Sequence, residues 1–223
     1  ALGNLKYAAD SLGIRHPLLL TDETLTKLGL AAKFLSLTGL SNCTSYDRVP
    51  ADSSVDTVDQ IAKLYRDQGC DGIVALGGGS VLDTAKGVKL LIGQRADDIL
   101  GLMGCENLPR GERVPFIAVP TTAGTGSECT PVAVIRHPDR SVKLEYISPY
   151  MMPDAAFLDP RMTQSLPPRV TAATGLDALC HAIEACTCDQ HNPLSDAFAF
   201  AAMRIIVEKL PIAVGRNASD VRT

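Results

Sequence analysis

The chain has 223 residues, of which 46% are hydrophobic and 21% charged, with a formal net charge of -4 and a pI near 5.5. This mild acidity, without any lysine- or arginine-rich run, argues against nucleic acid or an anionic membrane as partner and favours a small-molecule ligand. No apolar segment reaches the roughly 20 residues that cross a bilayer, and no signal segment opens the chain, so we expect a cytoplasmic protein. The seven cysteines fit reduced thiols better than a disulfide framework.

Short apolar runs alternate with helical patterns over the first 160 residues. The helical patterns begin at the very start of the chain, near Leu5, and recur over residues 25–35, 58–65 and 81–91. Between them, strands are predicted at residues 17–21, 73–76, 116–119 and 155–158, and residues 132–135 and 141–145 could pair as a hairpin through residues 137–140. The alternation predicts a mostly parallel α/β sheet that binds its ligand at the carboxyl ends of the strands.

Beyond about residue 160 the pattern is helical only, which places a domain boundary there. Helices are predicted over residues 172–186 and 193–209, and Leu210–Pro211 is expected to end the second one.

A glycine-rich turn, Gly77-Gly78-Gly79-Ser80, joins a predicted strand to a predicted helix. Without Cβ atoms, its backbone N–H groups can approach a phosphate at the positive end of the helix. A tight turn without a ligand is an equally good interpretation, because this motif matches neither the dinucleotide fingerprint nor the P-loop.

Asp22 ends the first predicted strand, where a carboxylate can accept hydrogen bonds from both hydroxyls of an adenosine ribose and repel a 2′-phosphate. This favours NAD over NADP. Asp22 could instead cap the following helix, and the two roles are compatible. The segment 121–128 carries several hydroxyls and two glycines after a strand, so it could contact a carboxamide or ribose, or be an inert loop. Lys143 alone suggests a solvated surface lysine.

Asp177 and His181 lie four residues apart on one face of a predicted helix, where a divalent metal can bridge them. Two ligands are fewer than the three that a catalytic metal site normally needs, and the pair could also be a hydrogen bond on the helix surface. A structural zinc site is a weaker alternative, because the nearby residues lack the paired spacing of zinc fingers. Those residues are Cys180, Cys186, Cys188 and His191.

Three motifs together closely resemble the iron-containing (group III) alcohol dehydrogenases, in the same order and with the same spacing. They are Gly-Gly-Gly-Ser with Asp83-Thr84-Ala85-Lys86, residues 120–128 and residues 173–184. The resemblance covers essentially the whole chain. It implies a Rossmann-like NAD-binding α/β domain over residues 1–160, followed by the N-terminal part of an all-helical metal-binding domain over residues 161–223. The resemblance also implies a dehydroquinate-synthase-like architecture, with NAD(P) and substrate expected in the cleft between the domains.

By position, the resemblance assigns Asp22 to the adenosine ribose and Gly78, Gly79 and Ser80 to the diphosphate. The residues that it places beside the nicotinamide half are Thr121, Thr122, Thr130 and Lys143. Met162 stands where the family usually has a leucine beside the cofactor. Residues 50–53 read Pro-Ala-Asp-Ser where the family often carries Pro-Asn-Pro-Thr, which puts one adenine contact in question.

Asp177 and His181 match the family's first two ligands to Fe²⁺, or to Zn²⁺ in some members. In that mechanism the metal lowers the pKa of the alcohol, so that the alkoxide can pass hydride to nicotinamide. The remaining two ligands are histidines of a later helical segment, and none of the four histidines here stands in their place: His16, His137, His181 and His191. We expect the chain to be truncated at both ends, and a chain truly ending at Thr223 to bind metal weakly and turn over poorly.

The sequence therefore predicts a metal-dependent, NAD(H)-linked dehydrogenase of a small primary alcohol and its aldehyde, assembled as a homodimer or larger homo-oligomer. Two alternatives stay open. A glycerol-dehydrogenase-like or dehydroquinate-synthase-like relative would show a different metal helix and basic phosphate-binding residues. A truncated, non-catalytic NAD-binding fragment would bind NAD without alcohol-dependent NADH production.

Overall fold

The computed structural model describes residues 1–137 and 139–215. Two predicted features lie outside these described residues. They are Pro138 in the predicted hairpin turn and the chain end at residues 220–223. Internal contacts divide the chain into two units, which are Ala1–Thr121 with Ser127–Asp159, and Thr122–Gly126 with the residues from Pro160 onward. Across the described ranges, no helix is both long enough and apolar enough to cross a membrane.

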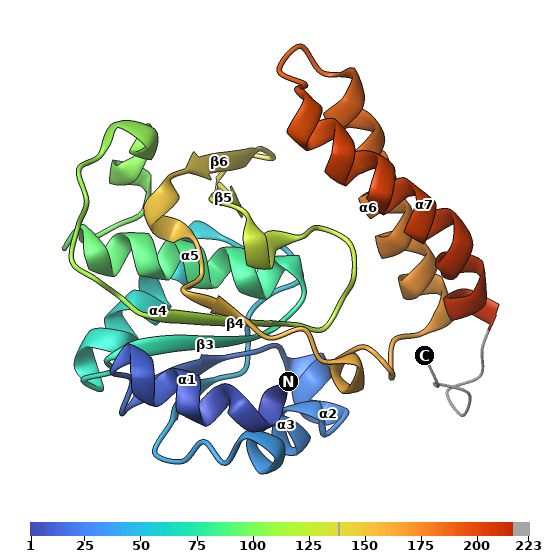
Figure 1. Cartoon of the computed structure of the whole chain (residues 1–223). Helices are drawn as coiled ribbons and strands as arrows, with labels where there is room; N and C mark the ends of the chain where they lie inside the picture. The colour runs from blue at the N-terminus through green and yellow to red at the C-terminus, as the bar shows by residue number, and fades with distance from the viewer. Residues whose placement is uncertain (138, 216–223) are drawn as a thin grey trace. The chain divides into compact units, whose positions relative to one another are not determined.

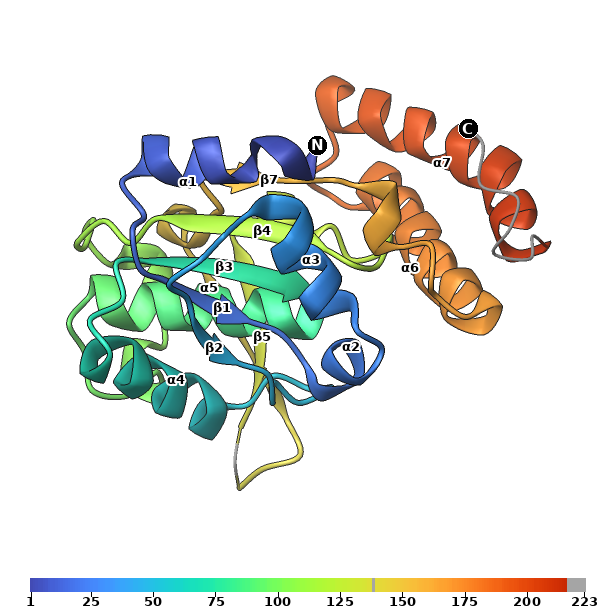
Figure 2. The ribbon, with the colours of Figure 1, turned by 90° about the horizontal axis from the view of Figure 1, so that it is seen from below.

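The first unit is built on a parallel sheet with the strand order β2-β1-β3-β4-β7. Its strands are β1 (Pro17–Leu20), β2 (Thr44–Tyr46), β3 (Gly72–Gly77), β4 (Phe116–Pro120) and β7 (Ala155–Ala156). Its helices are α1 (Leu5–Leu12), α2 (Glu23–Lys27), α3 (Leu30–Thr38), α4 (Val55–Asp67) and α5 (Gly79–Gly93). Figures 1 and 2 show α1 and α3 on one face of the sheet and α4 and α5 on the other.

Burial on both faces explains the composition of the central strands, since every residue of β1, β3 and β4 is buried. Such strands are continuous apolar runs with no polar face. A separate antiparallel pair, β5 (Val132–Arg136) and β6 (Lys143–Ile147), packs its first strand against α5. Short 3₁₀ helices complete the connections: η1 (Leu2–Asn4), η2 (Leu100–Leu102), η3 (Cys105–Asn107), η4 (Ser127–Cys129), η5 (Pro149–Met151) and η6 (Pro160–Met162).

The second unit contains two long helices, α6 (Pro168–Thr187) and α7 (Pro193–Gly215), which lie side by side. Many of their large apolar side chains are exposed in this chain: Val170, Leu176, Ile183, Leu194, Phe198, Phe200, Ile205, Val207 and Ile212. The predicted Rossmann-like α/β fold followed by helices is confirmed.

Several predicted boundaries are wrong. The helical pattern over residues 25–35 is two helices, because Gly29 adopts a left-handed φ of 73° that ends the first helix and starts the second. The second hairpin strand lies two residues later than predicted, at 143–147, and the strand predicted at 155–158 spans only two residues. Strand β2 carries only one buried residue in its pattern and has no apolar run that would predict it.

The prediction that Leu210–Pro211 ends the last helix is also wrong, because α7 continues to Gly215 with Pro211 inside it. Proline removes one backbone donor, which is costly in an isolated helix. Here Leu210 packs so closely on α6 that a Cβ built at Gly175 would lie 2.4 Å from its Cδ1. This tertiary contact holds α7 in helical conformation across the proline.

Candidate functional site

The strand order creates one preferred place for a ligand. From β1 the chain turns outward to β2, and it then crosses back to β3 on the other side of β1. Parallel sheets of this order bind ligands where the connections diverge, which here is at the carboxyl ends of the neighbouring strands β1 and β3. Asp22 follows β1 and Gly78 follows β3, so both lie at this edge, and Thr121 follows β4 at the same edge.

The turn between β3 and α5 has two backbone N–H groups without a hydrogen-bond acceptor among the described residues. Gly79 and Ser80 are the first two residues of α5, and their N–H groups have no acceptor in residues 1–137 and 139–215. Gly78, the N-cap, has φ -79° and ψ -170°, and Gly79 likewise has no positive φ. Since a residue with a side chain could adopt these angles, what glycine adds here is room for another group to approach the backbone.

Gly77 is required for a different reason, the close packing of β3 on α5. A Cβ at Gly77 would lie 2.4 Å from Cγ2 and 2.5 Å from Cβ of Val81. Because Val81 Cβ cannot rotate away, we expect Gly77→Ala to lower the free energy of unfolding by about 1–3 kcal/mol, measured by urea denaturation. Gly3→Ala is the matched control, since nothing lies within 4 Å of its Cβ position. An equal loss in both variants would contradict this packing role.

Asp22 caps α2, as the alternative interpretation of this residue proposes. Its Oδ1 accepts a hydrogen bond from the Leu25 N–H at 2.8 Å, and Asp22 itself is partly buried. Oδ2 has no hydrogen bond to any residue that the structure describes. Next to it, the hydroxyl of Thr21 is buried with no partner among those residues. Capping therefore occupies one carboxylate oxygen and leaves the other available to a ligand.

Ser80 contributes its backbone and not its side chain to this edge. Its hydroxyl donates to the carbonyl of Ala51, while Thr84 donates to Ser53 Oγ at 2.8 Å. Lys143 also joins this segment, because its Nζ lies 3.1 Å from Asp52 Oδ1. Both side chains of this pair are about 60% exposed, at 61% and 59%, so the pair contributes at most about 1 kcal/mol and can exchange partners.

Of the remaining predicted cofactor residues, Thr121 is buried and donates its backbone N–H to the Gly77 carbonyl at 3.0 Å. Thr122 is partly buried. Thr130 is also partly buried, and its hydroxyl oxygen accepts a hydrogen bond from Lys86. Met162 lies in η6 and is 1% exposed.

Asp83 and Lys86 belong to a motif of the family resemblance but have no role assigned from the sequence, and they form a buried network beside Thr130. Lys86 Nζ lies 3.9 Å from Asp83 Oδ1. Burial lowers the pKa of Lys86 and raises the pKa of Asp83. Every residue of α5 is buried or partly buried, so the helix has no exposed face for the lysine in its middle.

The predicted metal ligands Asp177 and His181 lie one turn apart on α6. Asp177 Oδ1 is 3.8 Å from His181 Nε2, and the side chains are 44% and 52% exposed. This distance is too long for the hydrogen bond that the alternative interpretation requires. It is close to the roughly 3.4 Å that separates two ligands of a tetrahedral metal site.

No group of three or more metal-ligating side chains occurs in the described ranges. Within those ranges, Asp177 and His181 are therefore a pair without a third metal-ligating neighbour. A structural zinc site formed by Cys180, Cys186, Cys188 and His191 is likewise not assembled there. His191 instead lies 3.3 Å from Asp196.

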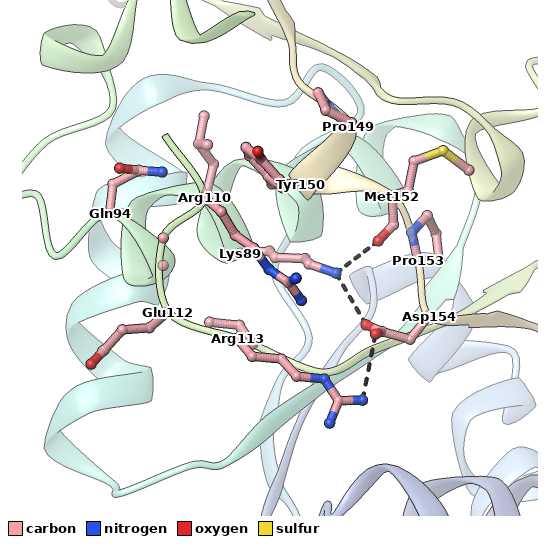
Figure 3. A pocket seen from close by; sticks show the side chains of 14 residues that line it. Lys89, Gln94, Arg110, Glu112, Arg113, Pro149, Tyr150, Met152, Pro153 and Asp154 are labelled. Carbon is pink, nitrogen blue, oxygen red and sulfur yellow. Dashed lines mark hydrogen bonds and ion pairs between the residues drawn. The ribbon is translucent and has the colours of Figure 1, made fainter. Parts of the chain in front are cut away.

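A hollow of ≈ 270 Å³ lies elsewhere in the first unit, beside the last turns of α5 and the start of β4 (Figure 3). Two of its cationic side chains share one carboxylate, since Asp154 contacts Lys89 at 3.1 Å and Arg113 at 3.7 Å. Asp154 also accepts the Phe116 N–H at the amino end of β4. The hollow is therefore remote from the carboxyl edge and is not the candidate cofactor site.

Two family models match this chain. The model described as iron-containing alcohol dehydrogenase matches residues 1–160, and the one for the C-terminal part of the Fe-containing alcohol dehydrogenase family matches residues 171–223.

Individual proteins agree with the family models. The chain is 40% identical over 218 residues to a Salmonella typhimurium protein named "Probable alcohol dehydrogenase EutG", covering 96% of this chain and 54% of the relative. It is 38% identical to the NAD-dependent methanol dehydrogenase of Bacillus methanolicus, covering 94% and 55%. The solved alcohol dehydrogenase from Oenococcus oeni superposes with a TM-score of 0.90 at 33% identity, covering 96% and 57%. The chain thus spans about half the length of the curated relatives it matches.

Proposed function

The chain belongs to the iron-containing alcohol dehydrogenase family, and on that premise we propose that the protein transfers hydride between a small primary alcohol, or its aldehyde, and NAD(H). An oxidoreductase of this family needs a dinucleotide site and a metal site. The observation that carries the proposal is that one edge of the sheet offers groups suited to a dinucleotide.

At that edge, the free Oδ2 of Asp22 can accept hydrogen bonds from the adenosine ribose. The open N–H groups of Gly79 and Ser80, beside Gly78, can donate to the diphosphate at the positive end of α5. A carboxylate at the ribose position favours NAD over NADP, since it would repel a 2′-phosphate.

For the nicotinamide half we propose side chains that follow β4 or begin β6. These are Thr121, Thr122, Thr130 and Lys143, with Met162 packing beside the cofactor. Hydroxyls suit the carboxamide and ribose, while Met162 supplies an apolar contact that excludes water.

Asp177 and His181 are proposed as ligands to Fe²⁺, with Zn²⁺ as the alternative metal. When bound, such a metal polarises the alcohol oxygen and lowers its pKa. The carboxylate and imidazole are partly exposed, and their 3.8 Å separation lets both reach one ion. At least one further ligand must come from outside the described residues, among which no third ligand joins the pair.

In domain terms, we propose that residues 1–160 bind the cofactor and that residues 161–223 are the N-terminal part of the metal-binding domain. The protein is further proposed to act in the cytoplasm as a homodimer or larger homo-oligomer, without nucleic-acid or membrane partners.

The test is alcohol-dependent formation of NADH by the purified protein, followed by absorbance with a series of small primary alcohols and added Fe²⁺. In a protein that supplies the further metal ligands beyond residue 223, we expect turnover that a chelator removes and that Fe²⁺ restores, whereas a chain ending at Thr223 should turn over poorly. Calorimetric NAD⁺ binding without NADH formation would instead identify a non-catalytic NAD-binding fragment. If NAD⁺ did not bind, the dehydrogenase proposal would be wrong.

A further inference from the structure

Lys86 is the most deeply buried charged side chain in the first unit, with an exposed fraction of 0%. Its ammonium group donates to Ser127 Oγ at 2.8 Å, Thr130 Oγ1 at 3.0 Å and the Val132 carbonyl at 2.7 Å. An ammonium group has three donors and no acceptor, so all its hydrogen-bonding capacity is used. Lys86 thereby joins the middle of α5 to the segment that runs from η4 into β5.

The two hydroxyls that Lys86 contacts differ in whether their protons have a hydrogen-bond acceptor. Ser127 is buried, and its hydroxyl donates to Asp83 Oδ1 at 2.6 Å. The other carboxylate oxygen of Asp83 accepts the Val134 N–H at 3.0 Å. Ser127 is therefore satisfied inside the protein.

The Thr130 hydroxyl accepts one hydrogen bond, from Lys86, but donates none to a described residue. Because Lys86 can only donate, the Thr130 oxygen must accept from it, and the hydroxyl proton has to point elsewhere. No acceptor for that proton occurs within the ranges that the structure describes. Thr130 is partly exposed, so the proton is left available to a group from outside the described residues.

We propose that Lys86 is a positioning residue, which orients the Thr130 hydroxyl as a hydrogen-bond donor to the carboxamide oxygen on the nicotinamide ring of NAD. This inference rests on the proposed function. Asp83 balances the charge of Lys86, and Ser127, which accepts from Lys86 and donates to Asp83, holds the ammonium group in place. Lys86 itself acts only through Thr130, since its own donors are all occupied.

A purely structural lysine would be hard to explain at this position. Burying an ammonium group is costly, and apolar side chains of similar volume usually stabilise a core as well as a buried ion pair does. A lysine does what an apolar residue cannot, which is to force a neighbouring hydroxyl into the donor role. The consequence is a specific effect on ligands that present an acceptor to Thr130.

The experiment is a double-mutant cycle on ligand affinity, with Lys86→Met, Thr130→Val and the double variant. Calorimetry measures dissociation constants for NAD⁺ and for ADP-ribose, which lacks the nicotinamide ring. Lys89→Met is the matched control, because Lys89 is a largely buried lysine of the same helix that contacts Asp154 and Met152 instead. Each variant's urea denaturation is recorded to separate stability from affinity.

We expect Lys86→Met and Thr130→Val each to weaken NAD⁺ binding about fivefold to tenfold, the loss of one hydrogen bond, and to change ADP-ribose binding less than about twofold. In the Thr130→Val background, Lys86→Met should add no further loss. Lys89→Met should leave both affinities unchanged.

Equal weakening of NAD⁺ and ADP-ribose, or a Lys86→Met loss that persists without Thr130, would overturn the inference and leave a structural lysine. If Lys86→Met does not fold, Thr130→Val decides, since unchanged NAD⁺ affinity in that variant also overturns it. Failure of the unaltered protein to bind NAD⁺ would overturn the proposed function, and this inference with it.

Discussion

Replacing His181 by alanine is expected to reduce iron-dependent turnover by about 1,000-fold or more. The metal's polarisation of the alcohol oxygen is worth several kcal/mol, and each 1.36 kcal/mol is about tenfold in rate. Affinity for Fe²⁺ should fall by at least about 100-fold, because only one ligand of the α6 pair would remain. Asp177→Ala should lower turnover and Fe²⁺ affinity by similar factors. Metal content by elemental analysis and NADH formation with excess Fe²⁺ measure the two effects.

His191→Ala is the matched control for this prediction. His191 is similarly exposed, at 55%, and lies beside a carboxylate in the same unit, but no metal role is proposed for it. It should keep both bound iron and turnover. If His181→Ala retained its iron, the metal would be held elsewhere and the assignment of the α6 pair would be wrong.

Replacing Asp22 by serine is expected to shift coenzyme preference toward NADP by about 100-fold. Serine still caps α2 through its hydroxyl, so the helix should be retained. What is lost is the carboxylate, which we propose to hydrogen-bond the ribose of NAD and to repel a 2′-phosphate. Juxtaposed like charges cost several kcal/mol, and 1.4 kcal/mol is about tenfold in affinity. Calorimetric titration with NAD⁺ and NADP⁺ gives the ratio directly.

Asp22→Ala separates capping from recognition. It removes the cap as well, so it should lose about 1 kcal/mol of stability that Asp22→Ser keeps, with the same change of coenzyme preference. If both variants still strongly preferred NAD⁺, Asp22 would be a helix cap alone, and the ribose contact would have to be sought elsewhere at the carboxyl edge.

The strands and helices of the first unit were largely predictable, because their signals are local. The apolar run before Gly77 and the helical spacing after Ser80 each lie within a few consecutive residues. At two of the places where prediction failed, a distant contact or a special backbone angle decided the outcome. The left-handed Gly29 divides one helical pattern into two helices, and the packing of Leu210 on Gly175 carries α7 through Pro211.

The candidate site divides in the same way. Residue chemistry and spacing by themselves determined that Asp22 ends a strand, that glycines begin α5, and that Asp177 and His181 share one helix face, since periodicity is a local property. Only the tertiary structure decided that β1 and β3 are neighbours, which brings Asp22 and Gly78 to one edge. It also decided that Lys86 is buried against Ser127 and Thr130, residues more than 40 positions away in the chain. Strand order and burial depend on long-range packing of the whole chain, and no local pattern specifies them.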